Sequence, residues 1–222
     1  MSEIVMVISG KGGVGKTTTA ALLGLQFSRM DKKVVLVDTD FGFRNLDIFF
    51  CMENQIRYNV ADVLRGVCSV RQACITIDEN LSMIPGTKDD SFSCDEGRIA
   101  SFLQELSGSF DYIIIDTPAG ISSIHHMLLP YITQGILVMA WDQASISDAI
   151  SMSKLLQRGH MDYKVVLNEQ KPIRFLVPKQ ELIGLCDTVL NSEYIGRIPY
   201  QRQLVFDNRK LNKSLQMICS KL

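Results

Sequence analysis

The chain has 222 residues, a length that suits one sizeable α/β domain because single hydrophobic cores grow to roughly 250 residues before they split. Hydrophobic residues make up 46% of the chain and charged residues 21%, which excludes a disordered or fibrous protein. Lysine and arginine total 23 against 24 acidic residues. With a net charge of -1, no overall field attracts nucleic acid or anionic lipid, so a nucleic-acid partner is not expected.

Short apolar runs alternate with segments of helical pattern along the chain. The runs occupy residues 4–8, 34–37, 112–115, 136–139 and 165–167. They lack polar alternation, which is typical of strands buried on both faces of a parallel sheet. We expect helices at 17–30, 59–66, 95–106, 122–131, 145–158 and 179–190, a closing helix at 211–222, and loops at 89–94 and 169–178. The pattern predicts a single α/β domain over residues 1–222, with a mainly parallel sheet and helices on both faces.

The first apolar run leads into a glycine-rich segment that fits the phosphate-binding pattern G-x-x-x-x-G-K-[ST]. Its residues are Gly10, Lys11, Gly12, Gly13, Val14, Gly15, Lys16 and Thr17, followed by Thr18. Glycines let successive N–H groups face phosphate oxygens, and the helix that follows adds its N-terminal partial charge. Lys16 then reaches the β- and γ-phosphates, and the Thr17 hydroxyl is placed to bind Mg²⁺. A chance match has odds of roughly one in a hundred, so the alternative of an inert glycine-rich turn is disfavoured.

Carboxylates follow two of the expected strands at the sheet edge where ligands of parallel sheets bind. Asp116 ends the run at 112–115 and fits a Walker B carboxylate that holds the magnesium shell, followed by a loop able to sense the γ-phosphate. Asp38 and Asp40 end the run at 34–37. We assign Asp38 with Thr17 and Asp116 to the metal and Asp40 to the attacking water, with Asp38 the other candidate for the water. Helix capping is the structural alternative for each aspartate.

Lys11, a second lysine ahead of Lys16, makes the glycine-rich segment resemble the deviant Walker A motif of the MinD/ParA family of P-loop ATPases. Residues 38–47 resemble the MinD switch I and residues 115–121 its switch II. Asn168, Pro199 and Tyr200 lie where the family frames adenine. The resemblance implies ATP and Mg²⁺ as cofactors and an ATP-dependent homodimer.

In that homodimer, the resemblance implies that Lys11 crosses to the partner's phosphates and serves catalysis with Lys16 and Asp40. Regulatory protein partners that stimulate hydrolysis are also implied.

The middle of the sequence carries features of two branches of this family. The switch I stretch favours MinD and hence placement of the division septum, whereas residues 145–149 resemble the FlhG/FleN regulators of flagellar number and placement. Asp142 and Gln143 replace the Pro-Glu that usually comes just before them. Three further hypotheses stay open at this point: a ParA-like DNA-partitioning ATPase, a metabolic or metal-cluster carrier of the same fold, and a binding module without hydrolysis.

The N-terminus lacks a signal peptide and no apolar run approaches the ~20 residues of a membrane-spanning helix, so we expect a cytoplasmic protein. MinD proteins usually continue into a basic amphipathic tail, whereas this chain ends at Leu222 in the expected closing helix. Lys213 and Lys221 could make that helix a rudimentary anchor, which leaves peripheral contact with the inner face of the membrane open. Packing on the core is favoured. The three histidines are expected on the surface or on helix faces, not as ligands.

Overall fold

A computed structural model describes residues 2–93, 95–169, 178–201 and 208–222. Its centre is an eight-stranded sheet in the order β3-β4-β2-β5-β1-β6-β7-β8. The strands are β1 (Glu3–Ile8), β2 (Val34–Asp38), β3 (Ile75–Thr76), β4 (Leu81–Ile84), β5 (Tyr112–Asp116), β6 (Gln134–Met139), β7 (Tyr163–Asn168) and β8 (Glu193–Ile198). All pairs described are parallel except β3–β4, which is antiparallel. The predicted α/β fold with a mainly parallel sheet is confirmed.

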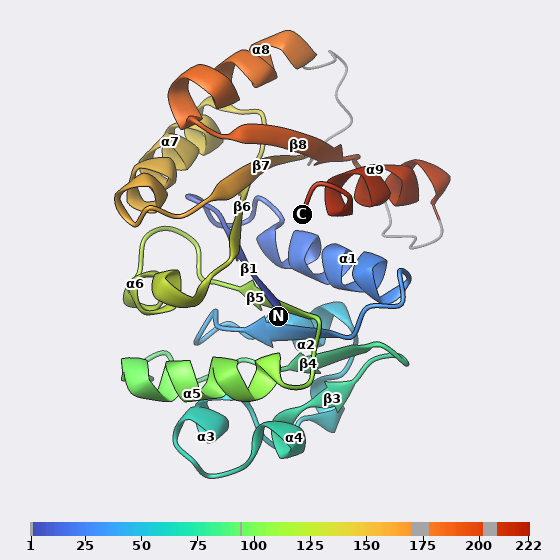
Figure 1. Ribbon diagram of the computed structural model, residues 1–222, viewed down its shortest axis with the longest axis vertical. Coiled ribbons are helices and arrows are strands. Elements are labelled where there is room, and N and C mark those ends of the chain that lie inside the picture. Colours follow the sequence, from blue (N-terminus) through green and yellow to red (C-terminus); the bar gives the residue numbers. More distant parts are fainter. Residues whose placement is uncertain (1, 94, 170–177, 202–207) are drawn as a thin grey trace.

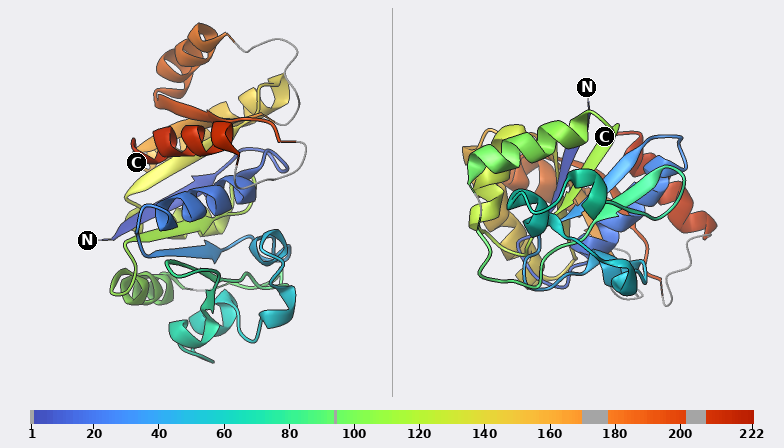
Figure 2. Two further views of the ribbon diagram at one scale, coloured as in Figure 1. Left: turned by 90° about the vertical axis from the view of Figure 1, so that its right-hand side faces the viewer. Right: turned by 90° about the horizontal axis from the view of Figure 1, so that it is seen from below.

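Helices cover both faces of this sheet (Figure 1). The helices are α1 (Lys16–Ser28), α2 (Leu46–Phe49), α3 (Val60–Leu64), α4 (Val70–Ala73), α5 (Glu96–Ser107), α6 (Ser123–Leu128), α7 (Gln143–Arg158), α8 (Lys179–Leu185) and α9 (Arg209–Cys219). Short turns of other helix types are η1 (Glu53–Gln55), η2 (Leu129–Tyr131) and η3 (Cys186–Leu190). Helices α1 and α9 lie together on one face, as the left view of Figure 2 shows.

Alternation along β1 divides the hydrophobic core into two layers. Met6 and Ile8 point into the layer built with α5, α6 and α7. Val5 and Val7 point into the layer built with α1 and α9. Because β1 is buried on both sides, its sequence is an unbroken apolar run, and that run predicted the strand. The prediction of one domain over 1–222 stays a prediction, and the single sheet shared by both layers supports it.

Several elements depart from the sequence-based expectations. Strands β3, β4 and β8 and helices α2 and α4 were not predicted, because each is short or carries too few apolar residues to show a period. The helix expected at 122–131 ends at Leu128 and continues as a 3-10 turn, and the one expected at 179–190 changes to a π-helical turn after Leu185. Of the predicted loops, 89–93 is irregular as expected, whereas Cys94 and residues 170–177 lie outside the described residues.

The closing helix packs on the body of the protein. Leu211, Leu215 and Ile218 of α9 are buried in the same layer as α1, while Lys213 faces solvent. The preference for core packing over a membrane anchor is therefore confirmed for this helix face. No helix within the described ranges is both long and apolar enough to span a bilayer.

Candidate functional site

The glycine-rich segment forms a tight loop between β1 and the first turn of α1. Gly13 and Gly15 have positive φ angles of 77° and 91°, a conformation that side chains with a Cβ rarely adopt. At Gly10 a Cβ atom would lie 2.1 Å from the backbone oxygen of Asp148 in α7. Two of these glycines are thus required by backbone conformation and Gly10 by close packing against a neighbouring helix.

A cavity of about 470 Å³ opens above this loop. It is lined by Ser9, Lys11, Gly12, Gly13, Gly15, Lys16, Thr17, Thr18, Asp40, Asn45, Ile48, Phe49 and Ala119. The structure therefore brings most of the predicted phosphate-loop residues together with Asp40 from the switch I stretch. Gly10 and Val14 are not among the lining residues, and Val14 is buried.

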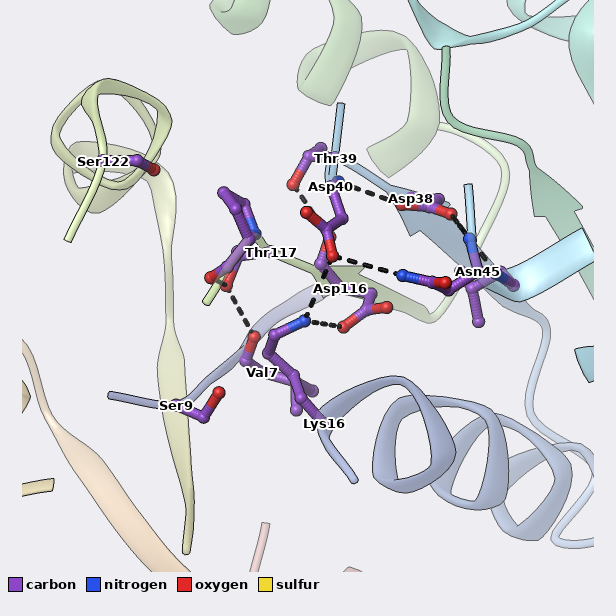
Figure 3. A network of polar contacts seen from close by, with 12 residues as sticks. Val7, Ser9, Lys16, Asp38, Thr39, Asp40, Asn45, Asp116, Thr117 and Ser122 are labelled. Atoms are coloured by element: carbon purple, nitrogen blue, oxygen red, sulfur yellow. Dashed lines mark hydrogen bonds and ion pairs between the residues drawn. The ribbon is translucent and has the colours of Figure 1, made fainter. Parts of the chain in front are cut away.

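Lys16 lies at the centre of the charges in this site. Its Nζ is 3.0 Å from Asp116 Oδ1 and 3.9 Å from Asp40 Oδ2, and Figure 3 shows the contacts to both carboxylates. The Lys16 side chain is only 7% exposed. Asp116 is fully buried at the end of β5. The ammonium group thus offsets two carboxylates that come from neighbouring strands, and it stands at the loop where phosphate oxygens would bind.

The residues present fit a magnesium ion. Asp116 Oδ2 is buried and has no hydrogen-bond partner within the described part of the chain. Burial raises the pKa of Asp116, and Lys16 and the Thr17 side chain lower it in part. A carboxylate oxygen without a partner beside a threonine hydroxyl is a donor set that Mg²⁺ prefers.

Asp38 lies beside Asp116 in the sheet, but its carboxylate accepts hydrogen bonds from backbone N–H groups. Its Oδ1 accepts a hydrogen bond from Asp40 N at 2.9 Å, and its Oδ2 accepts from Asn45 N at 2.9 Å and Leu46 N at 3.3 Å. Burial, followed by the charge of Asp116, raises the pKa of Asp38 to about 7. These contacts support the capping alternative, in which Asp38 holds the start of α2, and its role as a metal ligand stays a prediction.

Asn45 was missed by sequence reasoning. It lines the phosphate cavity, and its Nδ2 donates to Asp40 Oδ2 at 3.3 Å. Burial raises the pKa of Asp40, which Lys16 partly offsets. Asn45 therefore orients the carboxylate assigned to the attacking water. The only indication in the sequence was its place inside the switch I resemblance.

A second cavity, of about 290 Å³, lies on the other side of the phosphate loop. Asn168, Pro199 and Tyr200, the predicted adenine contacts, all line it, and Gly13, Gly15 and Thr18 line both cavities. Asn168 Nδ2 donates to Val14 O at 2.8 Å. The two cavities therefore adjoin one loop, with room for phosphate groups on one side and for a base on the other.

Lys11 has a contact within its own subunit that the sequence did not predict. Its Nζ is 3.6 Å from Asp142 Oδ1, and both side chains are nearly half exposed. Asp142 is the N-cap of α7 and accepts from Ser145 N at 2.9 Å. The ion pair is weak at this exposure, so Lys11 can leave it for a stronger anion.

His125 is fully buried on the inner face of α6, so of the two expected positions it takes the helix face and not the surface. Ser122 N donates to its Nδ1 at 3.2 Å, so the proton lies on Nε2, which is 3.1 Å from Thr117 Oγ1. Thr117 Oγ1 in turn donates to Val7 O at 2.9 Å. Burial lowers the pKa of His125 to about 4. The neutral imidazole thereby holds the Thr117 hydroxyl, which connects the loop after Asp116 to β1, the strand that leads into the phosphate loop.

The fold and the site define a P-loop ATPase with a second lysine in its phosphate loop. A family model described as an AAA domain matches residues 2–155. The septum site-determining protein MinD of Synechocystis is 33% identical over 216 residues, which cover 95% of this chain and 80% of that protein. The chain belongs to the MinD family of ATPases.

Solved structures agree with this assignment. The MinC:MinD cell division protein complex of Aquifex aeolicus matches with a TM-score of 0.83 and 29% identity, covering 99% of this chain and 95% of that one. MinD of Pyrococcus horikoshii complexed with Mg-ADP matches with a TM-score of 0.84 at 23% identity, over 100% of this chain and 96% of that one. At that identity the second likeness shows the shared fold.

Proposed function

We propose that this chain is an ATP-driven dimerisation switch that takes part in placing the division septum. The observation that carries the proposal is the buried Lys16 between Asp116 and Asp40, in a cavity whose rim holds the exposed Lys11. Lys16 and the loop amides bind the β- and γ-phosphates, and Thr17 with Asp116 holds Mg²⁺, which neutralises charge on the phosphates. Asp40, oriented by Asn45, positions the water that attacks the γ-phosphate.

Lys11 supplies the link between hydrolysis and assembly. Two triphosphates held face to face repel each other in a partly desolvated interface, and a lysine donated from each subunit offsets that charge. In the single subunit Lys11 pairs with Asp142 in an exposed contact that costs little to break. ATP therefore favours the dimer, and loss of the γ-phosphate weakens it. Regulatory protein partners recognise the ATP-bound dimer and stimulate hydrolysis, in the cytoplasm or at the inner face of the membrane.

Light scattering tests this proposal. Wild type is expected to form a dimer with Mg-ATP and to remain a monomer with Mg-ADP. Lys11→Ala is expected to stay monomeric with both nucleotides and to release phosphate at a rate at least about tenfold lower, by analogy with a trans-acting cationic finger. Lys154→Ala, an exposed lysine of α7, is the matched control and should behave as wild type.

An ATP dimer that survives Lys11→Ala with normal phosphate release would contradict the switch. Septum placement rests on the similarity to MinD relatives. In the segment 145–149, which carries the FlhG-like resemblance, Ser145 Oγ accepts a hydrogen bond from Ala140 N at 2.9 Å and so joins α7 to the end of β6.

A further inference from the structure

The end of β7 connects the two cavities of the site. Asn168 reaches one way, donating through Nδ2 to Val14 O of the phosphate loop at 2.8 Å. Glu169, the next residue, reaches the other way: its backbone N–H donates to Ile198 O at 3.0 Å. Two successive residues therefore join the phosphate loop to the last residue of β8, which lines the second cavity.

The Glu169 carboxylate extends this connection. Oε1 accepts from Arg197 at 3.0 Å, and Oε2 accepts from the backbone N–H of Tyr200 at 3.3 Å. The Glu169 side chain is only 10% exposed, and it raises the pKa of Arg197. One carboxylate thus holds both the end of β8 and the backbone just beyond it, which sets where Pro199 and Tyr200 stand at the cavity wall.

We propose that Glu169 is a positioning residue for the nucleobase, which shapes the second cavity by fixing the Pro199–Tyr200 backbone through Tyr200 N–H and Arg197. The inference rests on the proposed ATPase function and goes beyond it, because it assigns the affinity for the base to a charged pair outside the phosphate loop. The pair acts on the base end of the nucleotide and leaves the phosphate end to Lys16.

The Glu169–Arg197 pair differs from an exposed ion pair of the same chain. Glu193 and Lys221 meet at the opposite end of β8, where their side chains are 54% and 39% exposed. Such exposed pairs contribute little. Glu169 instead accepts a hydrogen bond from the backbone N–H of Tyr200, which loses its partner when the carboxylate is removed. A polar group left without a hydrogen bond in a part-buried site costs free energy.

The test separates the base end from the phosphate end of the nucleotide. KM and kcat for ATP hydrolysis are measured together with the inhibition constant of Mg-tripolyphosphate, which carries no base. Glu169→Ala is expected to raise KM for ATP about tenfold, with kcat and the inhibition constant changed less than about twofold. Arg197→Ala should raise KM in the same direction but less, because the bond to Tyr200 remains. Glu193→Ala is the matched control and should leave all three constants unchanged.

The two substitutions change the local charge in opposite senses, which makes the result decisive. If charge alone mattered, Glu169→Ala would lower KM for anionic ATP and Arg197→Ala would raise it, and that result would overturn the proposal. An unchanged KM, or a KM and an inhibition constant that rise together, would also overturn it. If Glu169→Ala fails to fold, Glu169→Gln keeps one acceptor oxygen and should show a smaller rise in KM. Wild type that neither binds nor hydrolyses ATP would instead overturn the proposed function.

Discussion

Three aspartates lie close together beside the phosphate loop, at the ends of β2 and β5. Asp38 and Asp116 are fully buried, Asp40 is partly buried, and burial raises the pKa of each of them. Lys16 contacts two of the three. The site therefore holds three carboxyl groups against one lysine, and a bound divalent cation would stabilise their charged forms. Different hydrogen bonds then separate the roles, since Asp38 is held by backbone amides while Asp40 faces the cavity.

We predict that Asp40→Ala still binds ATP but hydrolyses it slowly, by a factor of about 10² to 10⁴, since a positioned base contributes this much. Asn45→Ala should slow hydrolysis less, because it removes only the group that orients Asp40. Binding by calorimetry and phosphate release by a coupled assay measure the two effects. The exposed carboxylate Asp187 serves as a control in Asp187→Ala. Wild-type turnover in Asp40→Ala would move the water-orienting role to Asp38.

At the scale of elements, the phosphate loop is held between three others. Gly10 contacts the backbone of α7 at Asp148, and Asn168 of β7 touches the loop from the side of β8. The loop after β5 closes the remaining side, since Gly120 N donates to Ser9 O at 3.0 Å. The phosphate loop is therefore in direct contact with both the loop after β5 and α7.

Two glycines of the loop provide a matched test of this packing. Gly10→Ala is expected to lower the free energy of unfolding by about 1 to 3 kcal/mol, because its Cβ would lie 2.1 Å from backbone that cannot move without α7. Gly12→Ala should stay within about 0.5 kcal/mol of wild type, since within the described residues the nearest atom to its Cβ would be that of Ala119 at 3.8 Å, an ordinary van der Waals contact. Urea denaturation without nucleotide measures both. Equal losses of unfolding free energy in the two variants would show that Gly10 is not closely packed against α7.

At the scale of the whole molecule, the sheet order places β2, β5 and β1 side by side. Asp38 of β2 lies beside Asp116 of β5 in register, and Val7 of β1 lies beside Asp116 on the other side. Residues far apart in the sequence therefore meet at one edge of the sheet. A ligand that binds there contacts elements from both halves of the chain, so binding stabilises the fold as a unit.

Mg-ATP at about a hundred times its dissociation constant is expected to raise the free energy of unfolding by about 2.7 kcal/mol. Lys16→Ala should abolish this increase, because it removes the cation that contacts the β- and γ-phosphates. Thermal or urea unfolding with and without Mg-ATP measures the difference for each variant against its own nucleotide-free state. Lys154→Ala is the control and should keep the full increase. A Lys16→Ala protein that Mg-ATP stabilises as strongly as wild type would remove the basis of the phosphate-site assignment.

The sequence by itself determined the fold class, the phosphate loop and the resemblance to the MinD/ParA family. Strands buried on both faces leave unbroken apolar runs, and the loop needs glycines and lysines at fixed spacing, so both are local patterns. Only the tertiary structure showed how the aspartates differ in their contacts, since Asp38 and Asp40 are two residues apart and the local sequence does not distinguish them. It also revealed the partners of Lys11, His125 and Glu169, which lie on other elements. Such contacts depend on sheet order and side-chain direction, and neither is written in the local sequence.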